Sequence, residues 1–268
     1  MGPATRKVLR AVHRMFGPVL PPKALAFQCP LVPGRIHVDD QMLTSQSDAA
    51  VTHYLSVGRS ALDNIEASLV ATGRGWSDVV TCLDLPCGYG RVTRHLVQRV
   101  AASSITACDI DRQAVRFCAA EFGVQPLYSA HDLRRLRFPR HYDFIFVGSL
   151  LTHVAPPRDI HIVEALAAVL APSGLLIFST QGVTCLKHLS WYGVHFAKAE
   201  KEFRHQLEKD GVAWVPYPGR EDYGITLHAR ESLKGRIETV LGDHVSLVRF
   251  AERGWDAHQD VWSYQRSA

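Results

Sequence analysis

The sequence predicts an α/β fold in which helices cover both faces of a mostly parallel β-sheet. Short apolar runs alternate with longer amphipathic stretches, which is typical of consecutive strand-helix-strand units. The runs 144–147 and 175–178 are apolar at every position, as expected for parallel strands buried on both sides. A glycine-containing turn follows the first apolar run, where sheets of this kind bind ligands. The predicted fold is therefore doubly wound.

The expected elements follow in order along the chain. A helical stretch from residue 48 to 73 comes first. Strands are expected at 79–85, 104–109, 124–128, 142–147 and 173–179, with helices at 89–101, 111–122 and 157–171. Asp111 is the expected N-cap of the second of these helices, which runs to Gly123. A helix at 229–241 precedes two apolar segments at 245–250 and 260–265. We expect these two segments to pair in antiparallel fashion and to complete a seven-stranded sheet.

Residues 183–227 form an insertion after the fifth expected strand. It contains a helical stretch, 187–209, which ends at Gly211, and a loop rich in proline and aromatic residues at 214–224. An insertion of this length in a compact domain is either a lid over the substrate or a disordered segment. The aromatic residues favour a substrate lid.

Residues 1–45 are expected to form a basic N-terminal helix and a connecting loop, and residues 46–268 the main domain. Residues 1–38 carry six Lys or Arg and no acid. Apolar residues recur at helical spacing against this basic face. The helix either packs on the domain or on a partner subunit, as in a homodimer, or residues 5–17 contact anionic lipid.

Composition indicates a cytoplasmic globular protein. The chain has 268 residues, of which 47% are hydrophobic and 21% charged, enough for one large domain with a sizeable core. Its six cysteines lack C-x-x-C spacing and are expected to be reduced, buried thiols. We expect no signal peptide, no transmembrane segment and no metal site, because no apolar run is long enough and no set of acids clusters convincingly.

The turn after the first strand has the features of a nucleoside site. Asp84 ends that strand, Gly88 and Gly90 lie in the turn, and Asp109 ends the next apolar run. Glycines let the backbone approach a ligand, and an acid at the second position can bind ribose hydroxyls. A dinucleotide site would need a small residue where Thr93 stands. With acids and no phosphate-binding lysine, the pattern favours a positively charged nucleoside without phosphates.

These residues resemble the signature of the class I methyltransferases that use S-adenosylmethionine (SAM), in which an acid, a glycine-rich turn and a second acid follow one another. Pro86 stands where that family has its first glycine. The resemblance runs from about residue 54 to 266. Segments 142–153 and 258–262 are similar to a bacterial branch that acts on sugars, glycolipids or natural products. The resemblance implies a Rossmann-like methyltransferase fold with SAM as the cofactor.

The same resemblance implies roles for individual residues. Asp84 would hold the SAM amine, Asp109 the ribose and Asp132 the adenine amine, although Asp132 is alternatively a turn residue. The predicted cofactor-binding residues are Asp84, Pro86, Cys87, Gly88, Gly90, Asp109, Ile110, Asp132, Leu133, Gly148 and Ser149.

His153 is the leading candidate for a catalytic base. It lies just beyond the fourth expected strand, and a neutral imidazole can accept a hydroxyl proton near physiological pH. The alternative is a structural histidine that caps the loop before the prolines at 156–157. His228 is a second, weaker candidate. Gln181, after the fifth strand, is a candidate for orienting the acceptor.

The expected reaction is O-methylation of a small-molecule or sugar hydroxyl. Enzymes that methylate base amines usually carry an Asn/Asp-Pro-Pro-Tyr-like box after the fourth strand, where this chain has Gly148-Ser149-Leu150-Leu151. The domain also lacks a long basic groove with interleaved aromatic residues, so nucleic acid is disfavoured. Two alternatives are a SAM-binding protein that serves as a non-catalytic partner or scaffold, and a nicotinamide oxidoreductase on a related sheet.

Overall fold

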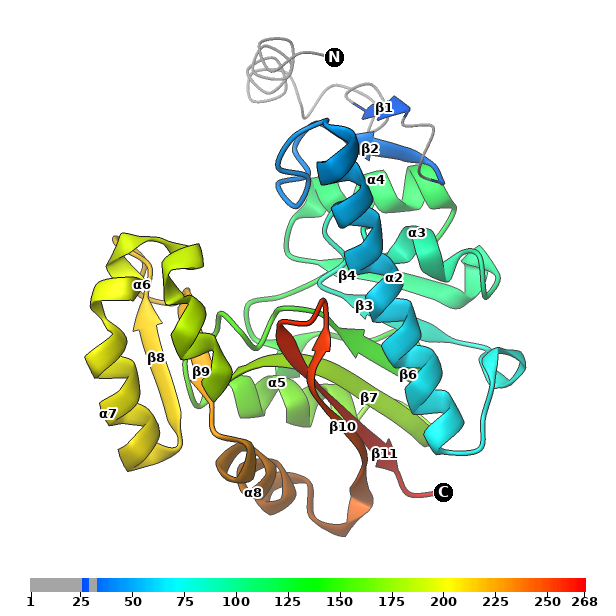
Figure 1. Ribbon diagram of the computed structural model, residues 1–268. Helices are drawn as coiled ribbons and strands as arrows, with labels where there is room; N and C mark the ends of the chain where they lie inside the picture. The colour runs from blue at the N-terminus through cyan, green and yellow to red at the C-terminus, as the bar shows by residue number, and fades with distance from the viewer. Residues whose placement is uncertain (1–25, 29–32) are drawn as a thin grey trace.

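A computed structural model of the protein describes residues 26–28 and 33–268 (Figure 1). Its central sheet has nine strands. They are β3 (Cys82–Leu85), β4 (Ile105–Asp109), β5 (Gln125–Tyr128), β6 (Tyr142–Val147), β7 (Leu170–Gly182), β8 (Val212–Pro216), β9 (Gly224–His228), β10 (Val245–Trp255) and β11 (Gln259–Arg266). Strands β1 (Ala26–Gln28) and β2 (Arg35–His37) form a separate antiparallel pair.

The helices fill the intervals between these strands. The α-helices are α2 (Asp48–Ala71), α3 (Thr93–Leu96), α4 (Arg112–Phe122), α5 (Arg158–Ala167), α6 (Val194–Lys198), α7 (Glu200–Asp210) and α8 (Arg230–Leu241). Short 3-10 segments are η1 (Trp76–Asp78), η2 (Ala102–Ser104), η3 (Leu133–Arg135), η4 (Val183–Tyr192) and η5 (Gly242–His244).

The order of the strands confirms the predicted doubly wound fold. Seven strands form one path, β10-β11-β7-β6-β3-β4-β5. Strands β3 to β7 pair in parallel, and β11 is antiparallel to both β7 and β10. The C-terminal antiparallel pair is therefore present as expected. Two further strands, absent from the prediction, extend the sheet at the end of β7, where β9 pairs with β7 and β8 pairs with β9.

Alternating side chains of the central strands build a core on each face of the sheet. In β6, Ile145 and Val147 pack toward α5 and α8, whereas Phe144 and Phe146 pack toward α2, α3 and α4. All four are buried. Successive side chains of a strand point to opposite faces of the sheet, and helices cover both faces. The central strands are therefore nearly uninterrupted apolar runs in the sequence.

Outside the insertion, one expected helix and two expected strands differ in length from the elements observed. The helix expected at 89–101 contains only one α-helical turn, α3, followed by tighter turns. Its β-branched residues Val92, Thr93, Val97 and Val100 are poor helix formers, and the glycine turn occupies its start. Strand β3 is shorter than the expected 79–85, and β7 is longer than the expected 173–179.

The insertion 183–227 has its own small hydrophobic core. The helix expected at 187–209 is broken into η4, α6 and α7. Gly193, with a φ of +118°, separates η4 from α6, and Ala199 separates α6 from α7. Gly211 ends α7 in the left-handed conformation, as predicted. The expected loop at 214–224 is present at 217–223, where it connects the antiparallel strands β8 and β9; residues 214–216 and 224 belong to these strands. Figure 1 shows this subdomain beside the C-terminal part of the sheet.

The N-terminal helix predicted around residues 5–17 lies outside the described residues. Among residues 26–28 and 33–268, no helix is long and apolar enough to cross a membrane. Five of the six cysteines fall in these ranges, and all five are buried free thiols. Cys29 lies outside them.

Candidate functional site

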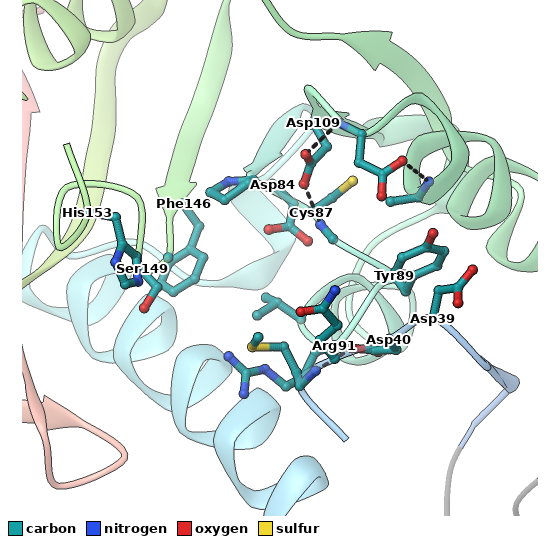
Figure 2. Close-up of a pocket in the computed structure, with 18 of the residues that line it drawn as sticks. Asp39, Asp40, Asp84, Cys87, Tyr89, Arg91, Asp109, Phe146, Ser149 and His153 are labelled. Carbon is teal, nitrogen blue, oxygen red and sulfur yellow. Dashed lines mark hydrogen bonds between the residues drawn. The ribbon is translucent and has the colours of Figure 1, made fainter. Parts of the chain in front are cut away.

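A cavity of about 840 Å³ opens at the carboxyl ends of β3, β4 and β6, the edge where doubly wound sheets bind ligands. Figure 2 shows its walls, with Asp84 and Asp109 on one side and His153 at the far end. The predicted residues that line it are Asp84, Pro86, Cys87, Gly88, Asp109, Gly148, Ser149 and His153. Its size suits a ligand of nucleoside dimensions together with a small second molecule.

The two glycines of the turn have different tasks. Gly88 has a φ of +48°, and a Cβ built on it would meet nothing within 4 Å, so its backbone faces open space in the cavity. Gly90 has a φ of +83°, and its Cβ would lie 2.5 Å from Cε2 of Phe122 and 3.2 Å from Sγ of Cys118. Gly90 therefore packs the turn against α4 and does not line the cavity.

Gly90→Ala is expected to destabilise the protein by about 2–4 kcal/mol, because a left-handed alanine costs about 1–2 kcal/mol and overpacking costs about 1–3 kcal/mol. Thermal unfolding measures the loss. Gly235→Ala is the matched control, since Gly235 lies inside α8 and its Cβ would meet nothing within 4 Å. That control should be neutral or slightly stabilising. Equal unfolding temperatures for G90A and the wild type would contradict this account of the turn.

Asp109 is held rigidly at the end of β4. Its Oδ2 accepts a hydrogen bond from the Gly88 N–H at 2.8 Å, and its Oδ1 accepts one from the Asp111 N–H at 2.9 Å. Burial raises the pKa of this carboxyl, while the backbone N–H groups act in the opposite direction. Each oxygen keeps a second acceptor site, so the carboxylate can bind two neighbouring hydroxyl groups. Asp111 caps α4, as predicted, by accepting bonds from two backbone N–H groups.

Asp84 lies deeper, at the end of β3. Only 1% of the residue is exposed, and burial raises the pKa of its carboxyl to about 7. The Thr93 hydroxyl donates a 2.6 Å hydrogen bond to its Oδ2 and opposes this shift. A buried carboxyl of this kind is ready to pair with a cationic group that enters the cavity.

His153 adopts the tautomer that a general base requires. Its Nδ1 lies 2.9 Å from the Gly224 carbonyl oxygen, which can only accept, so Nδ1 carries the proton and Nε2 keeps a lone pair. The Gly224 N–H in turn donates to the His153 carbonyl oxygen at 3.0 Å. Tyr223 stacks on the imidazole with ring centroids 4.8 Å apart. Burial lowers the pKa of His153, which keeps the ring neutral.

Five predicted residues do not line the cavity. Asp132 caps η3 and pairs with Arg134, whose side-chain hydrogen bond lowers the pKa of the carboxyl to about 2. Leu133 is buried in the core beneath α5, and Ile110 is an exposed side chain outside the lining. Gly90 packs against α4 and His228 is buried elsewhere. Asp132 is thus engaged in a helix cap, and Leu133 and His228 in the core, whereas Ile110 points to solvent.

His228 is not placed as a base. Strand β9 pairs with β7 through Leu227 and His228, and the imidazole lies against α5, with its Nδ1 3.9 Å from Oδ2 of Asp159. Both side chains are only 1% exposed. Burial lowers the pKa of His228 to about 4. A histidine sealed in the core cannot reach a substrate.

Sequence reasoning missed several residues of the cavity wall. They are Asp39, Asp40, Tyr89, Arg91, Phe146, Tyr223 and Trp255. The acidic pair comes from the loop after β2 and belongs to no recognisable motif. Trp255 reaches the cavity from the end of β10, and the Arg91 guanidinium lies 5.7 Å from the centroid of its ring. Of these residues, Tyr223 alone lies in a segment that the sequence analysis had connected with the substrate, the aromatic segment 214–224.

Gln181 also has a different task from the one predicted. It is 1% exposed and donates from Nε2 to the Tyr192 hydroxyl at 2.9 Å, so it orients a tyrosine rather than an acceptor. Within the part of the chain that the structure describes, no group of three or more His, Cys, Asp or Glu side chains is arranged to hold a metal ion.

Comparisons with known proteins point to one class of enzyme. A family model described as a methyltransferase domain matches residues 82–174, from β3 to the first part of β7. A search of curated proteins found no match. Among solved structures, a S-adenosylmethionine-dependent methyltransferase from Clostridium acetobutylicum is 14% identical, with a TM-score of 0.54, and the match covers 85% of this chain and 96% of that chain.

Two further structures share the fold. A magnesium protoporphyrin IX methyltransferase from Synechocystis is 20% identical, with a TM-score of 0.51 and coverage of 83% of this chain and 89% of that chain. An amino pentose methyltransferase from Micromonospora echinaspora is 14% identical, with a TM-score of 0.53 and coverage of 82% and 96%, respectively. At these identities the structures establish similarity of fold.

Proposed function

We propose that this chain uses S-adenosylmethionine to transfer a methyl group to a hydroxyl of a small molecule or a sugar, on the methyltransferase domain that the family model matches. The structural neighbours act on a porphyrin and an amino pentose, so the shared fold accommodates different acceptors. The proposal for a hydroxyl acceptor therefore depends on the site. The observation that carries it is the Nδ1-protonated, neutral His153 in the wall of the same cavity as Asp84 and Asp109.

The residues of the cavity fit the cofactor. The open space at Gly88 admits a ligand against the backbone of the turn, and the fixed Asp109 carboxylate offers two acceptors to the ribose hydroxyls. The buried Asp84 carboxyl suits the positively charged methionyl amine, directly or through water. When bound, the cofactor supplies an electrophilic methyl group on a sulfonium sulfur.

His153 would remove the proton of the acceptor hydroxyl through Nε2. The acceptor oxygen would then take the methyl group that the cofactor supplies, while Asp84, Gly88 and Asp109 would hold the cofactor in the cavity. The Gly224 carbonyl oxygen would stabilise the resulting imidazolium, because it accepts a hydrogen bond from the Nδ1–H group before and after the proton transfer. Positioning of the acceptor in a dry cavity supplies the remaining catalysis.

We extend the proposal to the insertion 183–227, as a lid over the acceptor. Its hairpin places Tyr223 in the cavity wall and joins the His153 loop through the backbone of Gly224. Thr226 continues this connection, since its N–H donates to the Thr152 carbonyl and its hydroxyl to the Val154 carbonyl. Docking of this lid therefore orients the base as well as covering it.

A screen for methyl transfer tests the function. The purified protein is incubated with SAM labelled in its methyl group and a panel of hydroxylated small molecules, including saccharides. We expect transfer of label to an acceptor and a product whose mass has increased by one methylene unit. Methylation of an amine or a carbon in preference to hydroxyls would contradict O-methylation. SAM binding without transfer to any acceptor would favour the scaffold alternative.

SAM affinity is expected to depend on pH because the pKa of Asp84 is raised to about 7 in the free protein. A bound ammonium group favours the ionised carboxylate, so binding below pH 7 must release a proton. Affinity should be constant above this pKa and fall by up to about tenfold per pH unit below it. Isothermal calorimetry in buffers of different ionisation enthalpy measures the proton release.

Asp84→Asn serves as the comparison for this prediction, since it keeps the size of the side chain and removes the titration. The variant should bind SAM more weakly, with little change in affinity across the same pH range. An affinity of the wild-type protein that stays flat through pH 7 would refute the assignment of Asp84.

A further inference from the structure

A second group of aromatic side chains lies outside the cavity wall and has no part in the proposed chemistry. Trp191, near the end of η4, is 67% exposed although it is a large apolar residue. His188 stacks on its indole, with ring centroids 4.2 Å apart and an interplanar angle of 29°. His258, from the turn between β10 and β11, lies 5.2 Å from the same indole. We call Trp191, His188 and His258 the aromatic platform.

Hydrogen bonds beneath the aromatic platform hold one of its members, His258, in place. The Tyr192 hydroxyl and Nε2 of His258 are 2.5 Å apart. The buried Gln181 at the end of β7 donates from Nε2 to the same hydroxyl at 2.9 Å. These bonds fix His258, and Trp191 packs against the rings of His258 and His188. An exposed tryptophan restrained by such contacts loses less conformational entropy when a ligand binds than a freely rotating one. The arrangement therefore differs from a single apolar side chain scattered on the surface.

The platform is connected to the cavity through the neighbouring residues. Gln259, next to His258, donates from Nε2 to the Ser149 hydroxyl at 2.7 Å, and Ser149 lines the cavity. Ser179 closes this network, because its hydroxyl accepts from the Ser149 N–H at 2.8 Å and donates to Gln259 at 2.7 Å. Trp255, the last residue of β10, also lines the cavity. A ligand longer than the cavity thus has a rigid support beyond its edge.

We propose that the aromatic platform is an acceptor subsite that binds a saccharide ring outside the reaction centre. This inference rests on the proposed function and adds the class of acceptor, a glycoside or oligosaccharide larger than one ring. The C–H face of a sugar packs on an apolar aromatic surface, while its hydroxyl groups bond to polar side chains at the edge. The platform offers both, through the indole and the two imidazoles.

The chemistry of the platform favours a sugar over the other small ligands. A planar aromatic ligand gains most when it is enclosed between two ring faces, but His188 already covers part of the indole. A phosphate or carboxylate binds best to a permanent cation, and none of the three side chains that form the platform is one. Neutral imidazoles both donate and accept hydrogen bonds, which matches hydroxyl groups.

Fluorine NMR tests the platform without requiring turnover. The five tryptophans are replaced with 5-fluorotryptophan, and Trp191→Ala identifies the Trp191 resonance. The probes are methyl β-glucoside, methyl β-galactoside, maltose and, as the aromatic comparison, phenol. We expect the saccharides, above all maltose, to shift the Trp191 resonance at millimolar concentration. His258→Ala should raise the Kd at least tenfold. Val194→Ala, which truncates an exposed apolar side chain nearby, should leave it unchanged.

SAM affinity is measured by calorimetry on the same samples. It distinguishes a failure of the platform proposal from a failure of the proposed function. W191A is expected to bind SAM as the wild type does. Normal SAM binding with no saccharide-induced shift of the Trp191 resonance would overturn the platform alone. A shift with phenol and none with the sugars would overturn the saccharide class. Failure of the wild-type protein to bind SAM would instead overturn the proposed function, whatever the sugars do.

Discussion

Asp109→Ala is expected to raise the Kd for SAM by about 100-fold or more while the protein remains folded. A hydrogen bond to a charged group contributes about 1.5–3 kcal/mol, and the ribose hydroxyls would lose two such acceptors. The substitution also releases the Gly88 N–H, which Asp109 now holds at 2.8 Å, so the turn loses a restraint. Calorimetry with SAM and with S-adenosylhomocysteine measures the loss for both forms of the cofactor.

Two variants make this test specific. Asp63→Ala removes an exposed acid of α2 that pairs only with Arg59 in the structure, so SAM affinity should not change. Asp109→Asn keeps one carbonyl acceptor and should lose less affinity than D109A. Thermal unfolding checks that all three variants are folded. A folded D109A protein with wild-type affinity would show that Asp109 does not bind the ribose.

His153→Gln is expected to lower kcat by about 10²–10⁴-fold, the usual contribution of a general base, with little effect on SAM affinity. The wild-type kcat at saturating SAM should fall as the pH drops below the pKa of His153, since the protonated ring cannot accept a proton. Burial lowers that pKa, so the loss begins below the ordinary histidine range near 6.5. H153Q should lack this acidic limb.

His205→Gln, on the exposed side of α7, is the control and should leave kcat and its pH dependence unchanged. Saturating SAM separates the titration of His153 from that of Asp84, which acts on cofactor affinity. If H153Q retains both its turnover and the acidic limb, His153 is not the base, although methyl transfer to a hydroxyl could still proceed by positioning.

The parts of the fold predicted best depend on local sequence. The runs of β3, β4 and β6 were placed to within a few residues, because strands buried on both faces are apolar at nearly every position. The cap residues of α4, Asp111 and Gly123, were likewise identified from the chain alone. The breaks at Gly193 and Ala199 in the helix expected at 187–209 were not identified.

The positions of some residues of the candidate site could likewise be predicted from the sequence, and those of others could not. Asp84, Gly88 and Asp109 follow adjacent parallel strands, and such strands end at one edge of the sheet, so their meeting could be predicted. Asp132 also follows a strand, yet its own helix cap and Arg134 hold it away from the cavity. Strand order places a loop, but local hydrogen bonds decide where its side chain lies.

The sequence by itself determined the doubly wound sheet and the acid-glycine-acid turn at its edge, because strand burial and backbone freedom are properties of short segments. Only the tertiary structure showed that His153 lines the cavity and that His228 is buried in the core. The contact that fixes the His153 tautomer joins residues 71 positions apart, and pairing of β9 with β7 turns His228 into the core. Such contacts form between segments remote in the chain, and no local pattern encodes them.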